Sequence, residues 1–166
     1  PATGMGRAMA DRFAKEGAAH VAVSDLDEAG AKSVAAAIGS NASGHRCDVS
    51  KEEDIRALVA QAQMAAGKPV DIFVSNAGIA DIDPDLNNAA SSPDPIWDRA
   101  WHVNVMSHVY AARVMLPGFK ARGEGYFVNV VSAAGLLTQV GSAVYSTTKH
   151  AALGFAESLA ISHRDD

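Results

Sequence analysis

Short apolar strands alternate with longer helical segments along the whole chain, and this alternation limits the fold more than any other feature. Apolar periodicity predicts strands at residues 20–24, 45–49, 70–74 and 126–131. Helices are predicted at residues 6–16, 27–38, 50–66, 96–121 and 143–163. Elements that alternate in this way form a parallel sheet with helices on both faces. The predicted fold class is therefore α/β.

Local signals refine these elements. Gly17 and Gly39 are expected to end the first two helices, because glycine tolerates the left-handed backbone that follows a helix. Ser50 and Glu53 have the spacing of a capping box at the start of the third helix. The segment 70–74 is apolar enough to be buried on both faces, as a central parallel strand is. Residues 79–95 are predicted to form a surface loop.

Composition narrows the classes of partner and compartment. The 166 residues are 48% hydrophobic and 20% charged, which fits one soluble domain spanning residues 1–166. A net charge of −5 without a basic run argues against nucleic acid, and no apolar stretch is long enough to cross a membrane. The single cysteine, Cys47, cannot form an intrachain disulfide, which favours a reducing compartment. We therefore predict a cytoplasmic protein.

Both ends of the sequence indicate a domain that is incomplete. Residues 1–7 look like the second half of a glycine-rich phosphate loop, which normally follows a central strand. The last residues, 164–166, follow directly after a predicted helix, where another strand is expected. We therefore expect this dinucleotide-binding domain to belong to a longer polypeptide, with a naturally short domain as the alternative.

Gly4 and Gly6 flank Met5 at the start of the first helix, where the backbone can approach a pyrophosphate and free N–H groups favour its charge. Glycine pairs at helix starts are common, so this signal is weak alone. Asp25 lies about 20 residues further on, where a carboxylate can accept hydrogen bonds from the adenosine ribose. The same charge would repel a 2′-phosphate, which favours NAD over NADP. Asp25 could instead, or also, cap the helix that begins near Asp27.

The strongest chemical signal is the pair Tyr145 and Lys149, which share one helix face at positions i and i+4. A nearby cation favours the phenolate and lowers the pKa of a tyrosine toward the range useful for proton transfer. Ser132 follows the predicted strand 126–131, at the edge where parallel sheets present ligands. In isolation, a tyrosine and a lysine at this spacing would more often be an exposed helix face.

Together these residues resemble the short-chain dehydrogenase/reductase family, in the same order and at similar spacings. The serine thirteen residues before the tyrosine is particularly specific. The resemblance implies a Rossmann-type, doubly wound parallel sheet, and the reversible oxidation of an alcohol to a carbonyl with NAD as cofactor. It rests on Gly4-Met5-Gly6, Asp25, Asp48-Val49, Asn76-Ala77-Gly78, Asn104, Ser132 and Tyr145 through Lys149.

The resemblance also implies a role for each residue. Tyr145 would exchange a proton with the substrate hydroxyl, and Ser132 would hydrogen-bond the substrate oxygen. Lys149 would hold the nicotinamide ribose, and Asn104 would anchor a water that links Lys149 to solvent. Asp48 would meet the adenine amino group with Val49 packed beside it. The candidate catalytic residues are Asn104, Ser132, Tyr145 and Lys149, and the candidate cofactor-binding residues are Gly4, Met5, Gly6, Asp25, Leu26, Asp48, Val49, Asn76, Ala77, Gly78, Tyr145 and Lys149.

Two other functions use the same kind of fold. An NAD-dependent sugar-nucleotide epimerase or dehydratase also has a tyrosine and a lysine, but it usually spaces its last loop glycines more widely than Gly4 and Gly6. A catalytically silent NAD-binding module is the second alternative, since a fold does not guarantee activity. The expected partners are a small alcohol or carbonyl substrate and further copies of the chain, in a homodimer or homotetramer.

The alternating residues Asp81, Asp83 and Asp85 superficially resemble a calcium loop. Leu86 and Ser92 stand where such a loop requires glycine and glutamate. We therefore predict a solvated loop here and no metal site in the chain.

Overall fold

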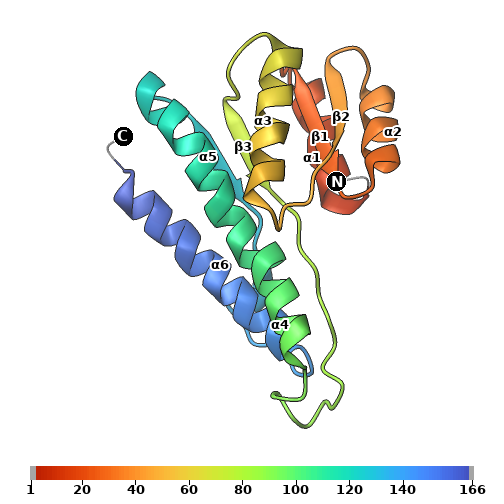
Figure 1. Cartoon of the computed structure of the whole chain (residues 1–166), viewed down its shortest axis with the longest axis vertical. Helices are drawn as coiled ribbons and strands as arrows, with labels where there is room; N and C mark the ends of the chain where they lie inside the picture. The colour runs from red at the N-terminus through yellow and green to blue at the C-terminus, as the bar shows by residue number, and fades with distance from the viewer. Residues whose placement is uncertain (1–2, 165–166) are drawn as a thin grey trace.

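The structure is a computed structural model, and it describes residues 3–164. Its helices and strands alternate along the chain (Figure 1). They are α1 (Gly4–Lys15), β1 (Val21–Asp25), α2 (Glu28–Ile38), β2 (Ala42–Arg46), α3 (Glu52–Ala66), β3 (Ile72–Ser75), α4 (Asp94–Trp101), a π-helical turn (His102–Met106), α5 (Ser107–Arg122), β4 (Tyr126–Asn129), a 3-10 turn (Ala133–Gly135) and α6 (Ala143–Ser162).

The strands form two parallel pairs. β1 pairs with β2 in the register that places Val21 beside Ala42, and β3 pairs with β4 with Ile72 beside Tyr126. Within residues 3–164, no strand ladder joins β1 to β3. Parallel pairing between strands separated by helices confirms the α/β, Rossmann-like class predicted from the sequence.

Helices cover both faces of the β1–β2 pair, because successive strand residues point to opposite faces. On one face, Val23 packs with Ala10 of α1 and Val34 of α2 in a buried cluster. Gly44 lies on that face against α2, and a Cβ built on it would lie 2.5 Å from the backbone of Lys32. On the other face, His45 reaches α3 through Gln61 (Nδ1 to Oε1, 2.8 Å). Only a glycine at position 44 therefore permits this close approach of α2.

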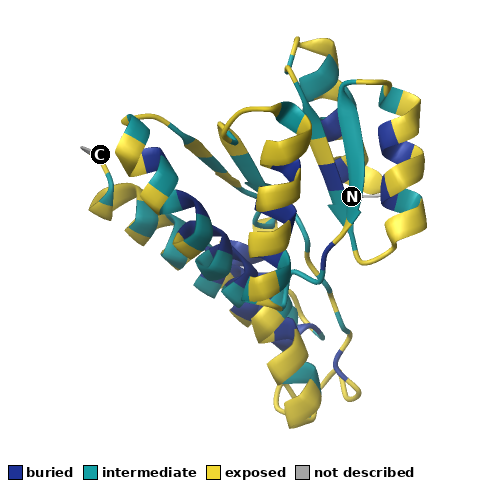
Figure 2. Ribbon diagram, turned by 45° about the horizontal axis from the view of Figure 1, so that its top comes forward, coloured by how far each residue is buried: buried dark blue, intermediate teal, exposed yellow. Residues whose placement is uncertain are grey.

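A second core joins α3 and α5 to the β3–β4 pair. Phe73 packs against Val114 and the buried Ile55, and Phe127 packs edge-on against Phe119 with ring centroids 5.1 Å apart. Figure 2 shows the buried residues gathered on the sides of the helices that face strands or other helices. This packing fixes β3 and β4, and the candidate site lies beyond their carboxyl ends.

Two local predictions are wrong. The second strand occupies 42–46 rather than 45–49, because its ladder with β1 ends where the Cys47 amide donates to the Asp25 carbonyl. The capping box at Ser50 does not form. The Ser50 hydroxyl donates to the Asp48 carboxylate (2.6 Å), and Lys51 is the residue that precedes α3.

The predicted strand 70–74 is β3, but it is not buried on both faces. Ile72 is 42% exposed, whereas Phe73 contributes to the core. The difference arises because α5 packs against β3 on the Phe73 side, while no described helix covers Ile72 on the other.

The long helix predicted at residues 96–121 is present but interrupted. α4 and α5 continue one another through the π-helical turn His102–Met106, where the Ser107 amide donates to the His102 carbonyl five residues earlier. Such turns carry one more residue than an α-helical turn and often occur at functional sites. This one contains Asn104, a predicted site residue.

Candidate active site

A cavity of about 440 Å³ lies at the carboxyl ends of β3 and β4. Six of its lining residues belong to the predicted site, and they come from four separate parts of the chain. These six are Met5, Asn76, Gly78, Ser132, Tyr145 and Lys149, and the cavity is completed by Ile79, Ala80, Val130, Val131 and Ala133. The fold therefore brings the predicted serine, tyrosine and lysine to one hollow.

α6 presents Tyr145 and Lys149 to this cavity from successive turns. The Lys149 amino group lies 5.7 Å from the centroid of the Tyr145 ring, and the lysine is only 4% exposed. Burial lowers the pKa of Lys149, because leaving water penalises the charged form. A positive charge held over an aromatic ring is favourable, and here it also stands beside the phenol.

Ser132 lies just beyond β4, at the start of the 3-10 turn. Its hydroxyl accepts a hydrogen bond from the Ala134 amide (3.1 Å), which fixes the direction of the side chain. The same turn packs closely on α6, since a Cβ at Gly135 would lie 2.9 Å from the Lys149 carbonyl oxygen. Ser132 is thus held against the helix that carries Tyr145.

Gly78 leaves room for the lysine head group at the base of the cavity. A Cβ built on Gly78 would lie 3.0 Å from Lys149 Nζ and 3.4 Å from Asn104 Oδ1. The absence of a side chain at this position is therefore what allows the lysine and asparagine side chains to stand beside the backbone of the loop after β3.

Asn104 is fully buried and its side chain binds the segment that follows Gly78. Its Oδ1 accepts from the Ile79 amide (2.8 Å), and its Nδ2 donates to the Ile79 carbonyl (2.9 Å) and to Thr148 Oγ1 (2.9 Å). Thr148 in turn donates to the Tyr145 carbonyl (2.9 Å). Both amide hydrogens of Asn104 are therefore used within the protein. Its predicted hold on a water stays a prediction.

The remaining predicted cofactor residues lie outside this cavity. Asp25 ends β1, and its Oδ1 accepts a hydrogen bond from the Asp27 amide (3.1 Å). It therefore supports the start of α2, which is the alternative role that the sequence suggested for it. Leu26 beside it is 60% exposed. Asp48 accepts from Ser50, and this hydrogen bond lowers the pKa of Asp48. Val49 packs into the core beneath α3.

The glycine-rich segment is placed at the start of α1. Gly4 has a φ of +59°, a conformation that favours glycine, and Gly6 is buried. Met5 between them is 66% exposed and lines the cavity. Ala77 is half-buried and does not line it.

The structure also contains groups that sequence reasoning missed. Ile79 and Thr148 hold Asn104, although neither residue type suggested a role. The prediction of a solvated loop is wrong for Asp83 and Ser92, whose exposed fractions are 4% and 7%. Asp83 binds the first turn of α6 instead. One signal in the sequence could have indicated this contact. The first amides of the helix that begins near Ala143 need acceptors, and Ser142 before it does not supply one.

Residues 1–166 match the family described as short chain dehydrogenase. The chain is 34% identical to sex determination protein tasselseed-2 of Zea mays over 98% of its length, and 33% identical to 3beta-hydroxysteroid dehydrogenase 2 of Eggerthella lenta over 99%. It is 33% identical to cis-2,3-dihydrobiphenyl-2,3-diol dehydrogenase of Paraburkholderia xenovorans over 96%.

The chain covers 48%, 63% and 57% of the lengths of these three relatives, so it corresponds to about half or somewhat more of each. In the described part of the chain, no helix combines the length and apolar character needed to cross a bilayer. The family match extends from the first residue to the last, and the predicted resemblance is confirmed: the chain belongs to the short-chain dehydrogenase family.

Proposed function

We propose that the protein is an oxidoreductase that transfers hydride between NAD(H) and an alcohol or carbonyl substrate. The observation that carries this proposal is the cavity in which Ser132, Tyr145 and Lys149 converge. A hydroxyl donor, a phenol and a buried ammonium are the groups needed to bind a substrate oxygen and move its proton. Relatives whose names describe dehydrogenases of steroids and dihydrodiols support the same class of reaction.

The proton chemistry belongs to Tyr145 in this proposal. During oxidation its oxygen accepts the proton of the substrate hydroxyl, and during reduction its hydroxyl donates a proton to the substrate oxygen. Ser132 holds that oxygen by a hydrogen bond, and the nearby Lys149 charge favours the ionised tyrosine. Burial lowers the pKa of Lys149, so its ammonium group holds its proton less firmly than it would in water.

The residues present fit a nicotinamide dinucleotide. Gly78 has no side chain, so the Lys149 amino group can lie beside the backbone at the cavity, where a Cβ would be 3.0 Å from Nζ. Gly4 and Gly6 present the start of α1, whose free amides suit a pyrophosphate. Asp25 would accept hydrogen bonds from the adenosine ribose, with Leu26, Asp48 and Val49 nearby at the adenine end. The bound cofactor would supply the hydride acceptor or donor, and the protein would orient it.

The test replaces Tyr145 by phenylalanine in the purified protein. We expect the catalysed oxidation of secondary alcohols with NAD, followed by absorbance of the reduced nicotinamide, to fall by about 100-fold or more, because the proton-transfer group is lost. NAD affinity, measured by calorimetry, should stay largely unchanged. Tyr126→Phe is the matched control, since Tyr126 is 70% exposed on β4. Turnover like that of the unmodified protein in the Tyr145 variant would remove this residue from the mechanism.

We further propose that the protein acts in the cytoplasm as a homodimer or homotetramer, with a small molecule as its substrate. The single buried Cys47 and the family membership support this assignment. Sedimentation of the purified protein tests the oligomeric state, and a monomer at micromolar concentration would contradict it.

A further inference from the structure

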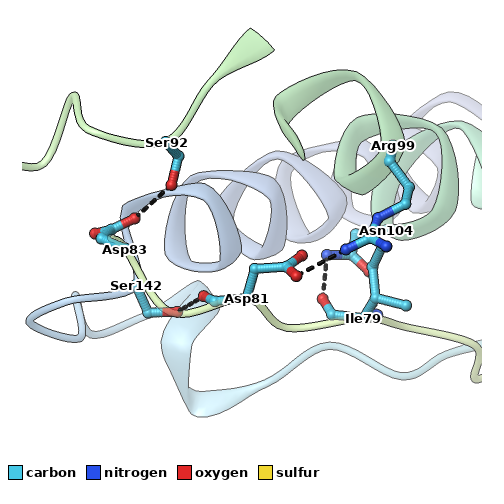
Figure 3. Close-up of polar contacts among 7 residues, drawn as sticks. All are labelled: Ile79, Asp81, Asp83, Ser92, Arg99, Asn104 and Ser142. Carbon is cyan, nitrogen blue, oxygen red and sulfur yellow. Dashed lines mark hydrogen bonds and ion pairs between the residues drawn. The ribbon is translucent and has the colours of Figure 1, made fainter. Parts of the chain in front are cut away.

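Asp83 is a buried carboxylate with both oxygens engaged. It is 4% exposed, although it lies in the loop between β3 and α4. Its Oδ1 accepts from the Ser92 hydroxyl (3.0 Å; Figure 3). Its Oδ2 accepts from the amide of Ala143 (2.9 Å), the first residue of α6. A charged group is buried at a cost unless such hydrogen bonds compensate it. Its position therefore needs an explanation beyond a surface loop.

Asp83 caps the first amide of α6, which Ser142, the residue directly before the helix, does not do. Ser142 precedes the helix, but its hydroxyl donates to the Asp81 carbonyl (3.0 Å) and caps no amide of α6. The Asp83 amide donates to the Gly141 carbonyl (2.9 Å), which adds a third bond between the two segments. A negative charge at a helix amino terminus is also favourable for the helix dipole. The first turn of α6 is thus fixed from a loop some 60 residues earlier in the chain.

The other end of the same short segment is fixed at the candidate active site. Ile79 binds the Asn104 side chain through both its amide and its carbonyl (Figure 3). Asn104 binds Thr148, which binds the Tyr145 carbonyl. The chain from Ile79 to Asp83 is therefore bonded to α6 at both of its ends, and the Tyr145 carbonyl is one of the groups in this series of contacts.

A salt bridge holds the middle of the segment. Arg99 Nη2 lies 2.7 Å from Asp81 Oδ1, so α4 anchors the loop segment between Ile79 and Asp83. Figure 3 shows these contacts side by side, with Arg99 and Asn104 reaching the segment from the helical side and Ser142 from the start of α6. The position of Asp83 is consequently determined by its surroundings rather than by the loop alone.

We propose that Asp83 is a positioning residue for Tyr145. This proposal rests on the oxidoreductase function proposed above. Ala143 is two residues before Tyr145, so the hydrogen bond from Ala143 to Asp83 sets where the first turn of α6 begins and how Tyr145 faces Ser132. Loss of that bond frees the first turn to fray, and the tyrosine hydroxyl then spends less time in the cavity.

The experiment compares Asp83→Ala with Asp83→Asn in the purified protein. Alanine removes both hydrogen bonds. Asparagine can keep them, because its carbonyl accepts from Ala143 and its amide donates to the Ser92 oxygen. We expect Asp83→Ala to lower kcat by about 10-fold or more while KM for NAD changes by less than about 2-fold, and Asp83→Asn to recover most of kcat. A residue that only stabilises the fold would leave kcat per folded molecule unchanged.

A second readout does not depend on turnover. The chain has three tyrosines, so ring-labelled protein gives a small set of NMR signals in which Tyr145 is assigned by Tyr145→Phe. We expect the Tyr145 signal to shift in Asp83→Ala and to stay in place in Asp85→Ala. Asp85 is the matched control, because it is an exposed acid of the same loop whose carboxylate accepts only from Asn87 among the described contacts.

Ser92→Ala covers the case in which Asp83→Ala does not fold. It removes one of the two bonds to the carboxylate, and we expect a smaller shift of the Tyr145 signal in the same direction. An unmoved Tyr145 signal in both variants, with kcat equal to that of Asp85→Ala, overturns the proposal. If the unmodified protein oxidises no alcohol, the proposed function fails, and the Tyr145 signal still decides whether Asp83 positions the tyrosine.

Discussion

The amino group of Lys149 occupies the space that a side chain at position 78 would need. A Cβ on Gly78 would lie 3.0 Å from Lys149 Nζ, closer than nearly all real contacts of this kind. Because Nζ is the end of a flexible side chain, the lysine can move aside, but only by leaving the place it holds between Asn104 and Tyr145. The relationship makes position 78 a probe of the lysine's location.

Gly78→Ala should therefore reduce activity more than stability. We expect kcat/KM for the alcohol to fall by about 10-fold, since displacement of a catalytic group by a fraction of an ångström is costly. Thermal unfolding should change little. Gly154→Ala on α6 is the control, because nothing lies within 4 Å of its added Cβ. Equal kcat/KM in both variants would show that the position of the lysine head group is unimportant.

Asp25 is expected to determine the choice between NAD and NADP. Its carboxylate at the end of β1 would repel a 2′-phosphate, so NAD should bind at least about 10-fold more tightly than NADP, and Asp25→Ala should narrow the gap. Calorimetry with both dinucleotides measures the ratio. Asp27→Ala is the control, since the Asp27 side chain makes no capping bond at α2. Equal affinities of the unmodified protein for the two cofactors would refute the assignment.

Asn104→Ala should destabilise the protein strongly. The variant leaves the Ile79 amide, the Ile79 carbonyl and the Thr148 hydroxyl without the partner that now satisfies them. We expect a loss of about 3 kcal/mol in the free energy of unfolding, because buried polar groups without partners are costly. Urea titration followed by circular dichroism measures it. Asn88→Ala in the exposed loop should cost less than about 0.5 kcal/mol, and a similar loss in both variants would contradict the prediction.

His108 should make the protein sensitive to mild acid. Burial, and to a lesser extent the Lys149 charge, lower the pKa of His108, although its hydrogen bond to Asn129 opposes the change. The unfolded chain then binds a proton near pH 6.5 that the folded protein does not, so the free energy of unfolding falls as the pH drops below this value.

His108→Gln can keep the bond to Asn129 without the titration. We expect urea unfolding of this variant to depend less on pH between about 5 and 7 than that of the unmodified protein. His102→Gln, at an exposed position, should keep the original dependence. The same acid sensitivity in the His108 variant would assign it to another group.

The sequence predicted the elements because their signals are local. The apolar faces of α3 and α5, and the end of α1 near Gly17, follow from periodicity and glycine chemistry within a few residues. Tyr145 and Lys149 were found for the same reason, since a single helical turn relates them. The burial of Asp83 could not be predicted, because it depends on a distant contact: α6, far along the chain, offers it an amide. The capping box failed for a local reason, since the Ser50 hydroxyl donates to the Asp48 carboxylate two residues earlier.

The interruption of the long helix could not be predicted either, because His102 to Met106 have no proline or glycine to mark it. The extra residue in this π-helical turn advances the helix by about 100° relative to an uninterrupted one. The faces of α4 and α5 are therefore rotated relative to one another about a common axis. As a result, Arg99 contacts the loop through Asp81, while Asn104 and His108 are buried. Deleting one residue from this turn would give a more regular helix, but it would rotate α4 relative to α5 and separate Arg99 or Asn104 from its present partner.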